Sequence, residues 1–413
     1  MSSLKRRLMI SLFAAGVMSL AASANAACAP GAPQLIIYHA GSLSAAFAAV
    51  EQLFTQQTGV CVTDVAAGSV DAARRITTGQ EPCDIFASAD FEDIDLLLKP
   101  AGFADYDILF GQGGMVLVYT ISSKNAATIT ASGSVFNPPA SVPDVADDWY
   151  MQLMQPGVAI GGSHPFLDPS GYRADLIFRL ADQLYQLPNL YDLLLEHYSV
   201  IKATDALGKT YDYQFIYEHS ALSAYNADAT KSYRYAKLPD QVGLSNPQLN
   251  RRYRKAAITI PGLGLPDTDT TVSIPATRVV WGLTVLKSAA NRDNALKFLQ
   301  LLFGLQGVAL QTTAGPTPIS PPIVNARDFE RLPSLLRPLV VRAQRGDDRC
   351  RRNSGLSETE PVWHGNGLSD VIGRRSIDGT CEARAHRSGG VTDLPRLHEL
   401  RCRRSRQSCL EPW

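Results

Sequence analysis

The chain has 413 residues with a formal net charge of zero, and this length exceeds what one hydrophobic core normally supports, so two domains are expected. The charge is unevenly distributed, because residues 342–413 contain 14 arginines and no lysine whereas residues 27–341 are acidic overall. An acidic body argues against nucleic acid as the main partner, and an anion bound there would have to be held by local dipoles.

The first 26 residues have the organisation of a secretory signal peptide. A basic segment, residues 5–7, precedes an apolar run over residues 8–22, and the small residues 24–26 fit the cleavage rule. We therefore expect a mature protein that begins at Ala27 and works in the periplasm or another extracytoplasmic compartment. An uncleaved anchor is less favoured, because the apolar run is shorter than the ~20 residues that span a bilayer.

Three of the seven cysteines, Cys28, Cys61 and Cys83, lie in the body of the chain. They form no CxxC pair and no metal-ligand pattern, so they predict a single disulfide whose pairing the spacing leaves open.

The other four cysteines lie in residues 342–413, a segment without a sustained apolar period. We assign this tail no fold and interpret it as a disordered extension or a shifted reading frame, with a basic binding arm as the less favoured alternative.

From Gln34 onward the sequence repeats a strand, a small-residue turn and a helix three times. The strands are predicted at residues 34–39, 60–65 and 84–87, and the turns at residues 40–42, 67–69 and 88–90. The first helix is indicated by four apolar residues with helical spacing, Leu43, Phe47, Val50 and Phe54. This alternation predicts an α/β fold with a parallel sheet.

A strand at residues 114–120 is predicted to leave this first lobe, and one at residues 279–286 to return to it. The predicted domains are residues 27–118 with 280–341 for the first lobe and residues 119–279 for the second. Two crossings between α/β lobes predict a hinge with the ligand in a cleft.

Within the second lobe we expect a strand near residues 158–160 and helices from Arg173 to about Leu184 and from Leu190 to Ile201. After the return strand, residues 291–293 are predicted to cap a further helix. The buried side of that helix is expected to carry Ala295, Phe298, Leu299 and Leu302.

Serines follow the three predicted strands at Ser42, Ser69 and Ser88. Open α/β sheets bind ligands at the carboxyl ends of their strands, and helix starts there offer free N–H groups and a partial positive charge to an anion. A serine before a helix is more often only an N-cap. The repetition of Gly-Ser in the first two units is what favours a ligand site.

The segment Asp168-Pro169-Ser170-Gly171-Tyr172-Arg173 offers another helix start in the second lobe. On pattern alone, this segment is an Asp-Pro turn with Arg173 in solvent. Elsewhere in this lobe, Glu218 is predicted to be a surface carboxylate and His219 a surface or packed imidazole.

Catalytic motifs are lacking: residues 203–210 match only a relaxed P-loop, and the sequence has no GxSxG, HExxH or paired CxxC. We therefore expect no enzyme.

Six segments, in this order along the chain, resemble the periplasmic molybdate/tungstate-binding proteins of ABC transporters, in the branch found in archaea and some bacteria. They are residues 39–43, 67–70, 87–90, 168–173, 217–218 and 235–239. The resemblance implies a type II periplasmic binding protein fold whose two α/β lobes close on an oxyanion. It also implies a monomer without cofactors that delivers molybdate or tungstate to a membrane permease.

The same resemblance implies the ligand set: Gly41, Ser42, Ser69, Asp168, Pro169, Ser170, Glu218 and Tyr235. In this branch two carboxylates, which correspond to Asp168 and Glu218, approach the metal of the oxyanion and expand its coordination from four to six. Sulfur does not readily accept such extra donors, so the carboxylates would exclude sulfate. The alternatives are a receptor for sulfate, phosphate or ferric ion, the last using Tyr233 and Tyr235, and an enzyme acting on a phosphorylated metabolite.

Overall fold

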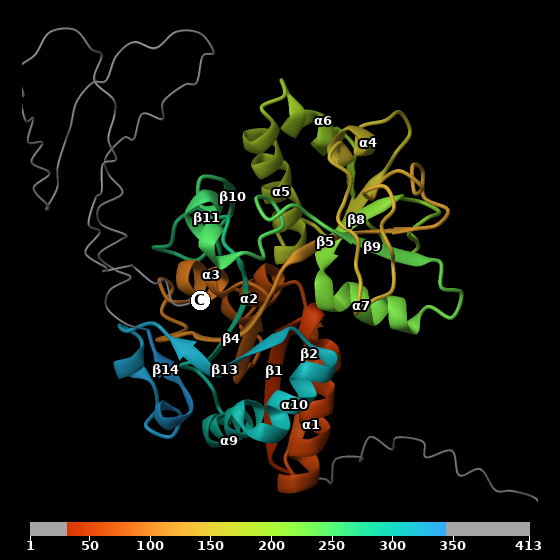
Figure 1. Cartoon of the computed structure of the whole chain (residues 1–413). Helices are drawn as coiled ribbons and strands as arrows, with labels where there is room; N and C mark the ends of the chain where they lie inside the picture. Colours follow the sequence, from red (N-terminus) through yellow and green to blue (C-terminus); the bar gives the residue numbers. More distant parts are fainter. Residues whose placement is uncertain (1–30, 344–413) are drawn as a thin grey trace, which may run out of the picture. The chain divides into compact units, whose positions relative to one another are not determined.

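The computed structural model describes residues 31–343, so the predicted signal peptide, Cys28 and almost all of the arginine-rich tail lie outside the described residues. The predicted α/β class is confirmed: a seven-stranded and a five-stranded sheet each carry helices, and a two-stranded hairpin is added (Figure 1). Within residues 31–343, no helix is both long enough and apolar enough to cross a membrane.

The seven-stranded sheet and its helices form what we call the first lobe. Its strands are β1 (Gln34–Ala40), β2 (Cys61–Ala67), β3 (Ile85–Ser88), β4 (Ile108–Gly113), β12 (Val279–Val285), β13 (Thr317–Val324) and β14 (Val341–Arg342), in the order β14-β13-β4-β12-β3-β1-β2. β1 runs parallel to β2 and β3, as the repeated units predict. β12 runs antiparallel to both β3 and β4, so the sheet is mixed. The predicted parallel pairing holds for β1, β2 and β3, and β13 also runs parallel to β14.

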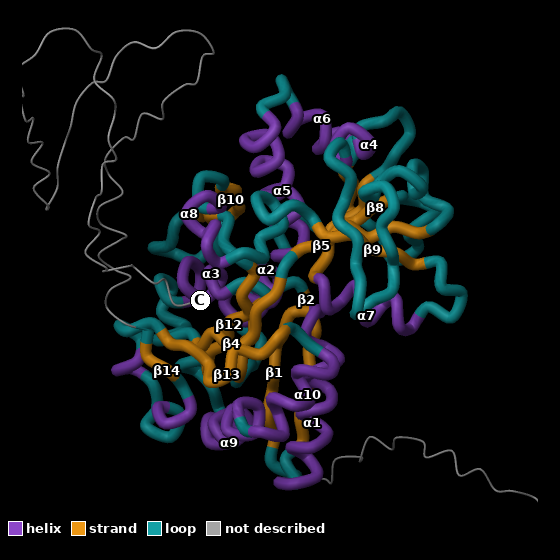
Figure 2. The backbone as a smooth tube through the Cα atoms, in the orientation of Figure 1, coloured by secondary structure: helices purple, strands orange, loops and turns teal. Residues whose placement is uncertain are grey.

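The helical segments of the first lobe are η1 (Gly41–Leu43), α1 (Ser44–Thr58), α2 (Ser69–Thr77), α3 (Phe91–Asp93), η2 (Ile94–Leu98), α9 (Arg292–Phe303), α10 (Leu305–Ala314), η4 (Phe329–Arg331) and η5 (Arg337–Leu339). The predicted apolar stripe of the first helix is buried throughout. Phe54 packs edge-on against Phe298 of α9 with ring centroids 5.4 Å apart, which fixes α1 beside α9. α10 also lies beside α1 (Figure 2).

The cysteines of this lobe differ in state. Cys61, the first residue of β2, is disulfide-bonded, whereas Cys83 is a free and buried thiol. Of the three cysteines among which a disulfide was predicted, Cys83 is therefore not a partner.

The five-stranded sheet and its helices form the second lobe. Its strands are β5 (Met115–Thr120), β6 (Ile160–Gly162), β7 (Tyr198–Val200), β8 (Tyr213–Tyr217) and β9 (Tyr233–Lys237), in the order β7-β6-β8-β5-β9, and its helices are α4 (Trp149–Leu153), α5 (Pro169–Tyr185), α6 (Leu190–Glu196) and α7 (Glu218–Ala227). The helix predicted to reach Ile201 is wrong beyond Glu196, because residues 198–200 pair with β6 as a parallel strand. α5 begins at Pro169, four residues before its predicted start.

The chain passes between the sheets at two places. β4 ends at Gly113 and β5 begins at Met115, so one glycine separates strands of different sheets. The return to β12 follows a segment that the sequence did not predict, made of η3 (Pro247–Leu249), α8 (Asn250–Tyr253) and the antiparallel hairpin of β10 (Ala257–Pro261) and β11 (Thr271–Pro275). The carboxyl ends of β2 and β3 lie near the start of α5, because Gly68 approaches Leu167 and the Ala89 carbonyl accepts a hydrogen bond from Arg173.

Candidate functional site

The predicted serines lie at the carboxyl ends of β1, β2 and β3, and the hydroxyls of all three are engaged by the protein itself. Ser69, buried at the start of α2, accepts a hydrogen bond from the Ala89 N–H through its Oγ at 3.1 Å. Ser88 Oγ accepts from the Asp90 N–H at 2.9 Å and donates to Asp93 Oδ2 at 2.7 Å. These hydroxyls therefore hold the loops after β2 and β3 together.

The Asp168 turn of the second lobe lies against the start of α2. The Asp71 N–H donates to the Leu167 carbonyl at 3.0 Å. A Cβ atom on Gly68 would lie 2.4 Å from that same carbonyl oxygen, so the approach requires glycine. The structure thus brings Ser69 and the Asp168 turn together from different lobes.

Asp168 is the N-cap of α5, since its carboxylate accepts a hydrogen bond from the Ser170 N–H at 3.0 Å. Burial raises the pKa of this carboxyl, while the Ser170 N–H and the positive charge of Arg173 act in the opposite direction. Pro169 follows as the first residue of the helix, where its missing N–H removes no helical bond.

Glu218 directly follows β8 as the first residue of α7, and its neighbour His219 reaches the first lobe. His219 Nε2 lies 2.9 Å from the Ser42 carbonyl oxygen, and burial lowers the pKa of the imidazole. Ser42 is held from a second side, because the Trp281 indole N–H donates to its Oγ at 3.0 Å. Gly41 and Ser42 are therefore brought to the start of α7.

Tyr235 of β9 is buried and lies in a small apolar cluster with Val116, Val118 and Ala221. Burial, and next the negative charge of Glu218, raise the pKa of Tyr235 to about 12. Ala221 of α7 belongs to the same apolar cluster and α7 contacts β9, so Tyr235 lies beside the helix that Glu218 begins. The predicted ligand residues thus fall into two contacting groups: Ser69 with the Asp168 turn, and Ser42 with the Glu218 region beside Tyr235.

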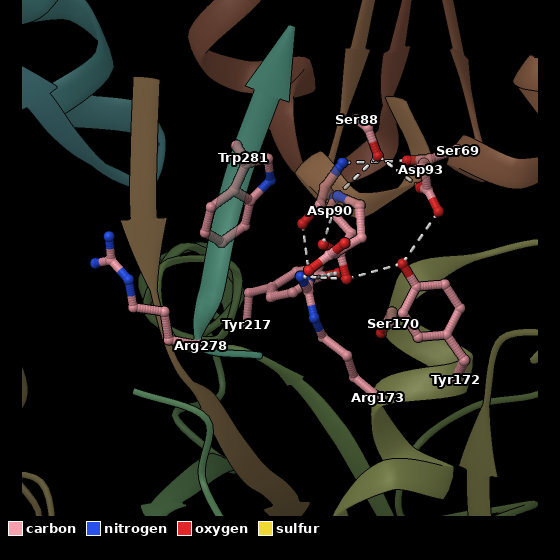
Figure 3. A network of polar contacts seen from close by, with 12 residues as sticks. Ser69, Ser88, Asp90, Asp93, Ser170, Tyr172, Arg173, Tyr217, Arg278 and Trp281 are labelled. Carbon is pink, nitrogen blue, oxygen red and sulfur yellow. Dashed lines mark hydrogen bonds and ion pairs between the residues drawn. The ribbon is translucent and has the colours of Figure 1, made fainter. Parts of the chain in front are cut away.

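A buried charge cluster between the lobes was missed by the sequence reasoning. Arg173 does not lie in solvent but is 1% exposed, and its Nη2 pairs with Asp90 Oδ2 at 2.9 Å (Figure 3). Its Nη1 donates to the Ala89 carbonyl at 2.7 Å and to the Tyr217 hydroxyl at 2.9 Å. A detectable signal existed, because Arg173 stands four residues before the buried Ile177 and so on an apolar helix face.

The neighbouring Tyr172 extends this cluster. Its hydroxyl lies 2.9 Å from Asp90 Oδ2 and 3.2 Å from Asp93 Oδ1 (Figure 3). Burial and the charge of Asp90 raise the pKa of Asp93 to about 8. The first turn of α5 therefore supplies partners to both carboxyl groups, in addition to the Ser88 hydroxyl on Asp93 and the Glu92 N–H on Asp90.

Comparisons with known proteins point to solute-binding proteins. The family profile described as bacterial extracellular solute-binding protein matches residues 35–315. An uncharacterized solute-binding protein of Petrotoga mobilis is 30% identical over 298 residues, covering 70% of this chain and 85% of that protein. The molybdate/tungstate-binding protein WtpA of Pyrococcus abyssi is 31% identical over 340 residues, covering 74% of this chain and 90% of that protein.

Solved structures with similar folds have low sequence identity to this chain. The sulfate-binding protein SubI from Mycobacterium tuberculosis H37Rv is 17% identical with a TM-score of 0.46, covering 70% of this chain and 87% of that one. The periplasmic molybdate-binding protein of Azotobacter vinelandii is 17% identical with a TM-score of 0.43, covering 68% of this chain and 98% of that one.

Proposed function

This chain belongs to the bacterial extracellular solute-binding proteins, and on that premise we propose that it captures molybdate or tungstate for import by an ABC transporter. As a solute-binding protein it is not an enzyme. The likeness to the WtpA protein of Pyrococcus abyssi supports a tetrahedral oxyanion as the solute. Its partners would be the oxyanion and a membrane permease, and it would act as a monomer.

The observation that carries this proposal is the meeting of helix starts from both lobes. The first turn of α2 bonds to the residue before Asp168 through the Asp71 N–H, and the first turn of α7 meets Ser42 through His219. Helix starts carry a partial positive charge and offer N–H donors, which suit an anion in an otherwise acidic protein.

We infer that Gly41, Ser42 and Ser69 contact the oxyanion from the first lobe, with residues 168–170 and Tyr235 opposite. A ligand that contacts both lobes binds the closed arrangement better than an open one. It therefore shifts the population toward closure, which is the signal a permease can recognise. The buried pair of Arg173 and Asp90 adds to the same closed arrangement.

The two carboxylates favour molybdate and tungstate over sulfate and phosphate. A carboxylate near an oxyanion repels it, so two of them would weaken a site built for sulfate or phosphate. Molybdenum and tungsten centres accept additional oxygen donors. We therefore assign Asp168 and Glu218 the role of approaching the metal of the bound oxyanion.

Isothermal titration of the full chain with tungstate, molybdate, sulfate and phosphate tests the proposal. Asp168→Asn is the sharpest variant, because an asparagine still caps α5 but carries no charge. We expect tight binding of tungstate or molybdate and an affinity at least about tenfold lower, or roughly 1.4 kcal/mol, in Asp168→Asn and in Glu218→Gln. The control Asp192→Asn, at an exposed position of α6, should bind like the wild type.

Heat from sulfate or phosphate alone would contradict the assigned ligand. An absence of heat from all four anions would contradict oxyanion binding altogether.

A further inference from the structure

A separate cluster of metal-ligand side chains lies beneath α1. His39 of β1, Glu51 of α1 and Asp64 of β2 each place one ligand atom within 4.8 Å of the other two. In the parallel register Ile37 lies opposite Asp64 and His39 opposite Ala66, so His39 and Asp64 project from the same face of the sheet. That face is covered by α1, which brings Glu51 onto it.

The burial of the three side chains is graded. His39 is fully buried and Glu51 is 8% exposed, whereas the Asp64 side chain is 37% exposed at the outer strand of the sheet. Glu51 Oε1 is buried and has no hydrogen-bond partner among the described residues 31–343. A buried carboxylate oxygen without a partner is costly, so a further positive group would stabilise the cluster.

The orientation of His39 suits a metal ligand. Its Nδ1 lies 2.8 Å from the Ala40 carbonyl oxygen, which can only accept, so Nδ1 carries the proton of that bond. Nε2 faces the cluster, where it contacts Asp64 Oδ1. A ligating histidine commonly donates its other N–H to a backbone carbonyl in this way, which fixes the ring.

A second acidic cluster in the same lobe shows the contrasting case. The carboxylates of Asp95, Asp107 and Asp328 also lie within 4.8 Å of one another, but Lys99 Nζ bonds to all three, at 2.8 Å for Asp107. There the ammonium group is the cation. Among residues 31–343, the charged groups that act on Glu51 are Asp64 and His39, so no ammonium group takes the place of Lys99 there.

We propose that His39, Glu51 and Asp64 bind a divalent cation of the zinc class. One imidazole nitrogen and two carboxylate oxygens form a ligand set that Zn²⁺ accepts, and water can complete the coordination on the exposed side of Asp64. A dication balances the two carboxylates and displaces the proton between His39 and Asp64. It would join α1 to β1 and β2 just before the Gly41–Ser42 turn, so its role is structural and it is not the transported solute.

Zinc binding by the full chain tests this site. The protein is stripped with a chelator, dialysed and titrated with Zn²⁺, and the bound metal is measured by elemental analysis. We expect about one Zn²⁺ per chain and a higher melting temperature with the metal. Glu51→Gln, which keeps the shape and removes the charge, should bind Zn²⁺ at least about tenfold more weakly. Asp95→Asn, from the lysine-filled cluster, should bind it like the wild type.

Failure of the wild type to retain zinc, or equal zinc binding by Glu51→Gln, would overturn the proposal. The spectrum of the Co²⁺-loaded wild type provides a test that needs no variant. Nitrogen and oxygen ligation without a thiolate charge-transfer band supports the site, whereas a thiolate band would place the metal on cysteine and overturn it. None of these measurements depends on the oxyanion titrations.

Discussion

Removal of the Arg173 guanidinium breaks several contacts between the lobes at once. In Arg173→Met, Asp90 loses an ion pair of 2.9 Å, and the Ala89 carbonyl and Tyr217 hydroxyl lose a common donor. Breaking a buried pair from one side leaves an uncompensated charge and costs about 3–5 kcal/mol. Since a typical domain is stable by roughly 5–15 kcal/mol, we expect a folded but clearly weakened protein.

Urea unfolding followed by circular dichroism measures this loss. Lys287→Met is the matched control, because Lys287 and Asp105 form an ion pair of 3.4 Å with about half of each side chain exposed. That exposed pair should contribute less than about 1 kcal/mol. Arg173→Met combined with Asp90→Asn should lose less than the sum of the two single variants, since no unpaired charge is then buried. A loss in Arg173→Met no larger than in Lys287→Met would refute the reasoning.

Three further predictions concern single contacts. Gly68→Ala should lower the unfolding free energy by about 1–3 kcal/mol, because its Cβ would lie 2.4 Å from the Leu167 carbonyl oxygen. The control Gly41→Ala, with open space at Cβ, should keep the wild-type stability. Equal melting temperatures of the two variants would contradict this. Burial raises the pKa of Glu92 to about 7, so the folded state holds that proton more tightly than the unfolded state and stability should fall as pH rises from about 4.5 through 7. In Glu92→Gln, stability should fall less steeply with pH than in the wild type. Parallel curves of melting temperature against pH for the two proteins would contradict this prediction. Trp281→Phe removes the donor to Ser42 Oγ at 3.0 Å and should weaken tungstate binding several-fold, which an unchanged dissociation constant would disprove.

Local patterns predicted the parts of the fold whose signals lie close together in the sequence. The apolar spacing from Leu43 to Phe54 defines α1, and the three small-residue turns locate the ends of β1, β2 and β3. The placement of β12 between β3 and β4 was not predictable, because pairing between distant strands leaves no local period. The short β7 was misread as helix since its apolar residues continue the pattern of α6.

For the candidate site too, the sequence predicted local turns and helix starts but not contacts between distant segments. Asp-Pro predicted the turn before α5, and Gly-Ser predicted the start of α2. The ligand roles of Asp168 and Ser69 come from the family resemblance and stay predictions. The partners of Arg173 lie far away in the sequence, so its burial appears only in the folded chain. The grouping of His39 with Asp64 likewise depends on the register of β1 with β2, which the sequence does not specify.

The most direct test of the central proposal is calorimetric titration of the full chain with tungstate in excess sulfate, for the wild type and Asp168→Asn. We predict that sulfate leaves wild-type tungstate binding unchanged and that Asp168→Asn binds tungstate at least about tenfold more weakly. Competition by sulfate, or equal tungstate binding by the two proteins, would contradict a site that uses a carboxylate to select the metal centre of its ligand.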